Sequence, residues 1–306
     1  MLPTVSTTRR PKPLTRRSFF PLLNGVAMLL IMAVTLYPVI NTVAISFNDG
    51  TDAVRGGIGL WPRVFSLKSY ETIFSDEIIY NAFFITVMRT LIQTVINVVL
   101  TSMLSFALSR REYVLRKFIT TAFVLTMYVN AGLIPNYLLI QRTLGLSKSF
   151  WVYIIPTMIS CFNMIVTRTF ILGLPEALVE SARIDGAGDF YLFWRIIFPL
   201  CLPVLATVAL FVAVGAWNSW FDTHLYNAGK VQLHTLQYLL KMKLATTTNS
   251  ANAAMTTADA AASTTLTTPV TIRAAITVVS AAPIVVIYPF LQRYFVVGLN
   301  VGSVKG

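Results

Sequence analysis

Apolar residues along this chain gather in long continuous runs separated by short polar segments, and they do not alternate with polar residues as in half-buried strands. A helix needs about 20 mostly apolar residues to cross a bilayer, and the runs are close to that length. Backbone groups in a bilayer must find partners within their own element, so continuous runs favour helices. The pattern predicts an all-α polytopic membrane protein with six transmembrane helices, at about Phe20–Phe47, Ile79–Leu108, Phe118–Pro135, Phe150–Val166, Leu200–Trp220 and Ala274–Leu291.

The composition agrees with a membrane protein. Of 306 residues, 56% are hydrophobic and only 12% are charged, and the mean hydropathy is +0.70. A soluble domain carries about 25% charged residues. The first run is longer than the apolar region of a signal peptide, which has about 7–15 residues. We therefore expect that run to stay as the first span.

The distribution of Lys and Arg predicts the orientation. Basic residues are concentrated in the N-terminal tail and in the loop between the second and third runs, which contains Arg110, Arg111, Arg116 and Lys117. The positive-inside rule places these segments and both termini in the cytoplasm. The net charge of +12 then reflects topology and contact with anionic membrane lipid. No basic recognition helix or aromatic RNA platform is visible, which argues against nucleic acid as the partner.

Residues for metal or nucleotide chemistry are sparse. Cys161 and Cys201 form no C-x-x-C pair, and His224 and His234 lie outside any cluster at ligand spacing. No G-x-x-x-x-G-K-[ST] loop is present. We expect no metal site, no catalytic residues and no ATP binding by this chain.

A charged segment separates the fourth and fifth runs. Pro175 suits the first turn of a helix, and Glu176 and Glu180 would share one face near its positive N-terminal end. Arg183 is three residues beyond Glu180 and is expected to pair with it. The same helix would offer a small, partly apolar surface made of Ala177, Leu178, Ser181, Ala182 and Ile184.

The end of this helix is also predicted. Asp185-Gly186 is a turn signal, and Gly186 is expected to take a positive φ as a helix C-cap glycine. A second short helix is expected at about Phe190–Ile197. Pro199 and Pro203 then restrict the entry to the fifth span.

The spacing in this segment resembles the cytoplasmic coupling loop of a bacterial ABC importer permease. The family pattern is Glu-Ala-Ala, three residues, Gly, nine residues, Ile-x-Leu-Pro. Glu180-Ser181-Ala182, Gly186 and Ile196 to Pro199 reproduce it, with Ser181 and Phe198 as departures. Asn-Ser-Trp-Phe-Asp at 218–222 and the segments 288–298 and 302–306 are similar to the second, maltose-type permease subunit of carbohydrate importers. The resemblance covers nearly the whole chain.

The resemblance implies a type I ABC importer permease fold and import of an oligosaccharide or polysaccharide into the cytoplasm. It implies three kinds of partner in a bacterial inner membrane system: a second homologous permease subunit, two ATPase subunits that bind ATP and Mg²⁺, and an extracytoplasmic sugar-binding protein. This chain would bind no cofactor. By residue match, Glu180 would contact the ATPase, and Ala182 and Gly186 would shape the helix and turn. The complete expected coupling set is Glu180, Ala182, Arg183, Asp185, Gly186 and Ala187.

The expected domain layout follows from these assignments. Residues 1–18 form a basic cytoplasmic tail and residues 19–306 form the permease domain. Within it lie the coupling loop 175–199, an outer loop 227–272 and a cytoplasmic C-terminal tail 293–306, which the resemblance places between the ATPases.

Polar residues inside spans are costly, so they face a cavity or a neighbouring helix. Candidates for a sugar path are Asn130, Asn163, Trp217, Asn218 and Asp222, together with Asn97. Hydrogen bonding between helices is the alternative for Asn, and anchoring at the membrane interface is the alternative for Trp.

Arg89 lies 19 residues before Leu108, about 28 Å along a helix, which places it at the outer headgroups by snorkelling. The alternative is that Arg89 attracts an acidic sugar. Six more cations map to the outer side, so an importer for a polyuronate such as alginate stays open: Arg142, Lys148, Lys230, Lys241, Lys243 and Arg273.

Two outer segments and one other function class complete the hypotheses. Residues 231–243 have helical spacing that suits a helix on the outer interface. The Thr- and Ala-rich stretch 245–268 is either a solvated linker or a loop that reaches into the binding protein, as the resemblance suggests. The remote alternative is an integral membrane glycosyl or lipid transferase with Asp185 or Asp222 as base, although titratable groups do not converge as such an enzyme requires.

Overall fold

The computed structural model describes residues 19–129, 131–243, 245 and 268–300. The predictions for the basic tail, for Asn130, for nearly all of the stretch 245–268 and for residues 301–306 lie outside the described residues. The described part is helical, apart from one isolated bridge between Asn48 and Phe65.

Three helices match the first, second and sixth predicted spans. They are α1 (Phe19–Ser46), α4 (Glu77–Ser109) and α13 (Pro269–Asn300). Each contains a stretch long and apolar enough to cross a bilayer. Asp76 caps α4 by accepting a hydrogen bond from the Ile78 N–H.

The third and fourth runs are not single helices, which corrects the prediction of continuous spans for these two. The third run consists of α5 (Arg116–Tyr128) and α6 (Leu133–Leu138), which continues as a π-helical turn at Leu139–Thr143. The fourth run begins with 3-10 turns at Phe150–Tyr153 and Ile155–Thr157, followed after a 48° bend by α7 (Cys161–Leu172). The described chain has six candidate spans when each bent pair counts as one.

The fifth span is α11 (Leu202–Asn218), and the residues before it turn sharply away. Asp189–Leu200 lies at 79° to α11 and contains α9 (Asp189–Leu192), a π-helical turn (Phe193–Ile197) and α10 (Phe198–Leu200). Pro199 and Pro203 fall at the starts of α10 and α11, where a missing N–H costs least. The second short helix expected at about Phe190–Ile197 is found at this place.

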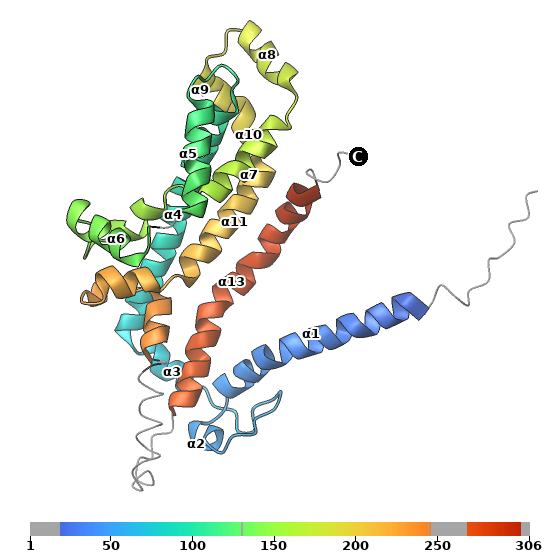
Figure 1. Ribbon diagram of the computed structural model, residues 1–306. Helices are drawn as coiled ribbons and strands as arrows, with labels where there is room; N and C mark the ends of the chain where they lie inside the picture. Colours follow the sequence, from blue (N-terminus) through green and yellow to red (C-terminus); the bar gives the residue numbers. More distant parts are fainter. Residues whose placement is uncertain (1–18, 130, 244, 246–267, 301–306) are drawn as a thin grey trace, which may run out of the picture.

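The elements form an elongated bundle with two distinct ends (Figure 1). At one end, α8 (Glu176–Ile184) projects beyond the other helices, and at the opposite end lie α2 (Gly50–Ala53) and α3 (Lys68–Phe74). We call these the α8 end and the α3 end. α4 packs against α7 and α11, and α11 packs against α13.

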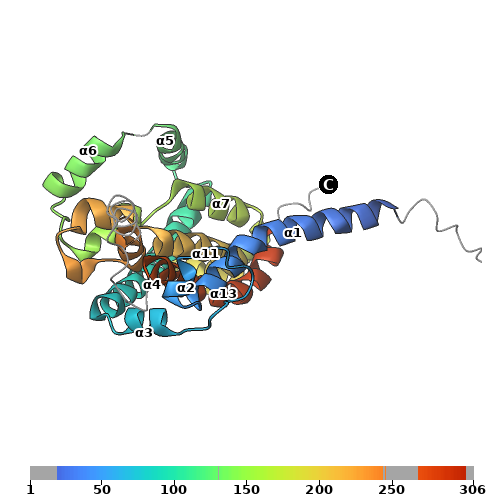
Figure 2. The ribbon, with the colours of Figure 1, turned by 90° about the horizontal axis from the view of Figure 1, so that it is seen from below.

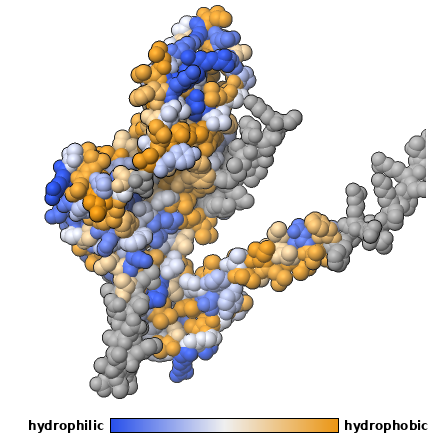
Figure 3. All heavy atoms as spheres, viewed as in Figure 1, coloured by the Kyte–Doolittle hydropathy of each residue, from blue (hydrophilic) through white to orange (hydrophobic). Residues whose placement is uncertain are grey.

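α1 leaves the bundle and points away from it, as the view from below also shows (Figure 2). Residues 20–40 of α1 are exposed along all faces, and their surface is largely hydrophobic (Figure 3). Only its end is held, where Asn41 donates to the carbonyl oxygens of Ile58 and Gly59. α1 contacts α13 within the chain. The exposed apolar length at residues 20–40 must be covered by lipid or by another protein.

A buried polar stripe on α4 ties the bundle together. Gln93 donates to the Thr157 hydroxyl, Asn97 donates to the Thr157 carbonyl, and Ser105 donates to the Met164 carbonyl. Spacings of three or four residues place the stripe on one helix face. Hydrogen bonds of this kind hold membrane helices together. The buried members are Thr86, Arg89, Gln93, Asn97, Thr101, Ser105 and Ser109.

The segment expected as an interfacial helix is packed inside the protein instead. A helix occupies residues 236–243, and Leu236 and Leu239 are buried in a cluster with Ile73, Ile79 and Trp217. The Leu236 N–H donates to the Thr86 hydroxyl of α4. The periodic leucines therefore pack against protein and not against the membrane interface. Helical spacing alone does not distinguish these two environments.

Candidate functional site: the α8 end and a polar groove

α8 ends in a complete Schellman motif, which confirms the expected positive φ at Gly186. The φ of Gly186 is +81°. The Gly186 N–H donates to the Arg183 carbonyl at 3.0 Å, and the Ala187 N–H donates to the Ala182 carbonyl at 2.9 Å. At the start of the helix, Pro175 is the cap residue and Glu176 the first helical residue. These two ends fix the length and direction of α8.

One face of α8 is anchored and the other is free. Val179 and Ala182 are buried in a hydrophobic cluster with residues of α4, α7 and the segment 192–205. This corrects the expectation that Ala182 belongs to the exposed surface, because the helix needs an inward apolar stripe to stay attached. Ile184 is 86% exposed and Leu178 is 41% exposed, so an apolar surface remains available for a partner.

Arg183 does not pair with Glu180, contrary to the prediction. It binds both oxygens of Glu112, with an Nη2 to Oε2 distance of 2.8 Å, and it also binds Asp189 at 3.3 Å. Glu112 belongs to the loop between α4 and α5, and Asp189 begins α9. The guanidinium braces the end of α8 against two neighbouring segments. Its hydrogen bond holds the pKa of Glu112 below the usual range and raises the pKa of Arg183.

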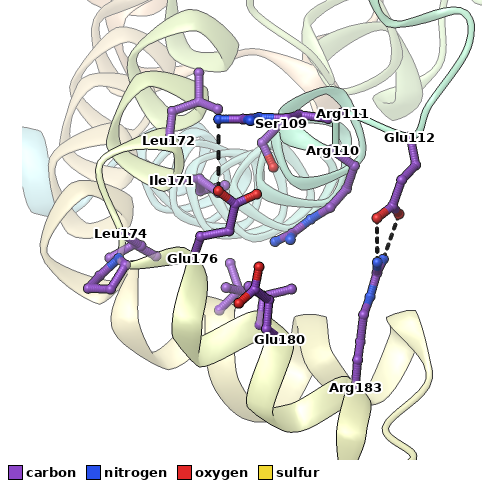
Figure 4. A pocket seen from close by; sticks show the side chains of 13 residues that line it. Ser109, Arg110, Arg111, Glu112, Ile171, Leu172, Leu174, Glu176, Glu180 and Arg183 are labelled. Carbon is purple, nitrogen blue, oxygen red and sulfur yellow. Dashed lines mark hydrogen bonds and ion pairs between the residues drawn. The ribbon is translucent and has the colours of Figure 1, made fainter.

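A pocket of about 170 Å³ lies between α8 and the end of α4 (Figure 4). The Arg110 guanidinium stacks over the Phe106 ring at 4.4 Å, and Arg111 faces Glu176 at 3.8 Å. Burial lowers the pKa of Arg110. Glu180 lines the pocket and is exposed, and it has no hydrogen bond or ion pair with any described residue. Its carboxylate is free to bind a partner.

Several residues of the α8 end were not identified from the sequence. Glu112 is 71 residues from Arg183, a separation at which no local pattern predicts a contact. Phe190 and Tyr191 are 70% and 58% exposed beside α8. In the sequence, the only sign of these exposed rings is the aromatic content of a segment between two spans.

The sequence-predicted path residues separate into buried and exposed ones. The Asn163 amide is buried next to Asn97, and the Trp217 indole N–H donates to the Ser280 carbonyl at 2.9 Å. Asn218 is exposed and donates to the Val214 carbonyl. The structure therefore gives Asn163 and Trp217 helix–helix contacts and leaves Asn218 at the surface.

Asp222 and Arg89 form a bidentate ion pair. The Arg89 side chain is only 2% exposed and stacks over the Tyr153 ring at 4.6 Å, whereas Asp222 is 22% exposed. This corrects the expectation that Arg89 snorkels to the outer headgroups. The Asp222 carboxylate, on the segment that follows α11, supplies the counter-charge that allows the Arg89 guanidinium to be buried.

A groove of about 280 Å³ lies between α11, the helix 236–243 and α13; its surface is mainly apolar, and we call it the polar groove for the four polar side chains that line it. Its polar lining residues are Asn218, Gln237, Thr277 and Ser280, and its apolar ones are Leu240, Ala281, Ile284 and Val285. Gln237 and Thr277 were not predicted as site residues. Among the described residues, no group of three His, Cys, Asp or Glu side chains is placed to hold a metal ion.

Six apolar segments, an anchored helix that projects beyond them and a polar groove between helices define a polytopic membrane transport protein. The family model of the "Binding-protein-dependent transport system inner membrane component" matches residues 85–301, and the chain belongs to this family.

Similar proteins support the assignment. The polygalacturonan/rhamnogalacturonan transport system permease YtcP of Bacillus subtilis is 34% identical over 95% of this chain and 99% of its own length. LplC of the same organism is 32% identical over 90% of each chain. A solved chain of a bacterial ABC transporter involved in import of the acidic polysaccharide alginate is 27% identical, with a TM-score of 0.82, over 93% of this chain and 100% of that one.

Proposed function

We propose that this chain is a permease subunit of an ATP-driven ABC importer that moves an oligosaccharide or polysaccharide into the cytoplasm. The observation that carries the proposal is α8, a short helix with one anchored face, one exposed apolar face and the unpaired carboxylate of Glu180. The names of the relatives give the substrate class, since YtcP and the alginate importer act on polysaccharides.

In this proposal, ATP hydrolysis in a partner subunit moves α8. A partner ATPase holds ATP and Mg²⁺ and contacts Glu180, Ile184 and the exposed aromatic residues beside them. Arg183, Asp185, Gly186 and Ala187 hold the helix at a fixed angle, and buried Ala182 transmits its movement to the first turn of α11 through the shared cluster. Interiors packed in this way transmit displacement because they are dense.

A second, homologous permease subunit is the proposed partner within the membrane, and membrane lipid covers the remaining surface. The exposed apolar length of α1 supports this assignment, because an isolated span gains packing only from a neighbour. An extracytoplasmic sugar-binding protein delivers the substrate, in keeping with the family description.

The sugar path of this chain is proposed to follow the polar groove. Asn218 and Gln237 offer amides, and Thr277 offers a hydroxyl, to the sugar hydroxyls. Asp222 follows Asn218 closely in sequence, and 22% of its side chain is exposed. Asn163 and Trp217 support the path from behind through their helix contacts. The transferase alternative has no support of this kind, because Asp185 follows α8 and Asp222 follows the far end of α11.

Purification of the tagged chain from its native membrane tests the assembly. We expect a second permease and two ATPase subunits to copurify in stable stoichiometry, because α8 and α1 both expose apolar surface. The chain purified alone should not hydrolyse ATP. ATP hydrolysis by the isolated chain, or its recovery without any of these partners under mild detergent, contradicts the proposal.

Labelling of single cysteines tests the orientation, in which both termini and α8 face the cytoplasm. In a background with Cys161→Ala and Cys201→Ala, a cysteine at Glu180 should react with a membrane-impermeant maleimide only after the cells are opened. A cysteine at Thr51, at the α3 end, should react in spheroplasts whose membrane is intact. The reverse pattern overturns the topology.

A further inference from the structure

At its edge the groove adjoins the Trp220 ring and the Lys241 ammonium. We propose that this edge is a subsite for a uronic acid residue. In it, the Lys241 ammonium binds the sugar carboxylate while the groove amides bind neighbouring hydroxyls. The inference rests on the proposed function and extends it from sugars in general to acidic sugars.

Lys241 is exposed and its ammonium lies 5.1 Å from the centroid of the Trp220 ring. Within the described part of the chain, Lys241 has no ion pair and no hydrogen bond. Lys243, two residues away, provides a contrast because it forms an ion pair with Asp76 at 3.1 Å. The cation–π contact therefore holds Lys241 in place and leaves its charge available.

Lys241 shares a helix face with a residue that lines the groove. Gln237 is four residues earlier in the helix 236–243, so the two side chains are neighbours on its surface. The Gln237 amide, half-buried in the groove with Asn218 and Thr277, also has no hydrogen-bond partner among the described residues. Partly buried amides without partners are suited to a polar ligand. The Lys241 ammonium thus adjoins, at the edge of the groove, the free Gln237 amide that lines it.

The local charges favour an anion at this edge. The nearest acid in sequence to Trp220 is Asp222, and Arg89 neutralises it through the bidentate pair. The Trp220 ring also contacts the His224 ring, whose centroid lies 6.0 Å away. A carboxylate entering here meets the Lys241 ammonium while Asp222 is already paired with Arg89, and charge-assisted hydrogen bonds of this kind are the stronger ones.

The test compares an acidic sugar with its neutral isostere. Labelled trigalacturonate and its trimethyl ester are each titrated against the complete purified transporter without its binding protein. We expect the complex to prefer the acid, and Lys241→Gln to weaken acid binding about fivefold while ester binding changes less than twofold. Trp220→Leu should reduce the same preference because it frees the lysine, and Trp220→Phe should retain most of it. Arg55→Gln, which removes an exposed cation that does not line the groove, is the matched control.

Four results overturn the inference: equal binding of the ester and the acid, equal weakening of both by Lys241→Gln, no effect of Lys241→Gln, and an Arg55→Gln effect like that of Lys241→Gln. The last result would assign the effect to general surface charge, and no effect of Lys241→Gln would assign the lysine to lipid phosphate. ATP-driven uptake of a sugar in parallel, with the binding protein present, separates these failures from a failure of the proposed function itself.

Discussion

Gly186→Pro should abolish sugar uptake, by more than about tenfold, while the protein still inserts and assembles. Gly186 has a φ of +81°, and proline is fixed near −65° and has no N–H. The substitution removes the hydrogen bond to the Arg183 carbonyl and forces the chain out of the Schellman turn. α8 then meets its partner at the wrong angle. ATP hydrolysis and uptake measured together in proteoliposomes should show hydrolysis continuing without transport.

Graded substitutions distinguish backbone geometry from general disruption. Gly186→Asn should reduce uptake less than proline, because Asn tolerates a positive φ. Gly188→Ala is the matched control: Gly188 has a φ of −73°, and an added Cβ meets no atom within 4 Å. It should change uptake by less than about twofold. Glu180→Ala should act in the same direction as Gly186→Pro but more weakly, since it removes one contact and keeps the backbone. Normal uptake by Gly186→Pro refutes the coupling role of α8.

Arg89→Leu or Asp222→Asn should each destabilise the folded protein by about 3–5 kcal/mol, because one partner of a buried ion pair is left without its counter-charge. Arg89 is 2% exposed and Asp222 is 22% exposed, so water offers little compensation. The change is measured as the denaturation midpoint of the purified chain in detergent and as the yield of folded protein.

The double variant Arg89→Leu/Asp222→Asn should recover most of the lost stability, since it removes both charges together. Arg111→Ala is the control for a surface pair. Arg111 and Glu176 lie 3.8 Å apart with side chains 81% and 64% exposed, and a pair of this kind contributes at most about 1 kcal/mol. A double variant destabilised by the sum of the two single variants shows that the two residues act independently, which contradicts the ion pair.

The sequence predicted the long helices and the turn of α8 but not the contacts that place them. Apolar runs give the length of α1, α4 and α13, and Asp185-Gly186 gives the end of α8, because both depend on local chain chemistry. The pairing of Arg183 with Glu112 and of Arg89 with Asp222 depends on helices that meet across 71 and 133 residues. Spacing on one helix suggested Glu180 as the partner of Arg183. Distance along one helix suggested that Arg89 reaches the lipid headgroups. In both cases a more distant carboxylate is the partner.

The groove was missed for a related reason. Gln237 and Thr277 read as ordinary polar residues in segments that the sequence assigns to an outer loop and a span. Only the packing of the helix 236–243 against α11 and α13 brings them to Asn218. The breaks within the third and fourth runs were also not predicted, since apolar composition is continuous through them, whereas Pro199 and Pro203 marked the break before α11.

Reconstituted uptake tests the central claim, that α8 couples this chain to an ATPase, most directly. Proteoliposomes would contain the chain with its copurified permease and ATPase subunits, and labelled oligosaccharide would be supplied outside with the binding protein. We expect ATP-dependent uptake that is lost when the ATPase subunits are omitted and lost with Gly186→Pro in their presence. Uptake by the permeases without the ATPase subunits, or full uptake by the complex carrying Gly186→Pro, would contradict the claim.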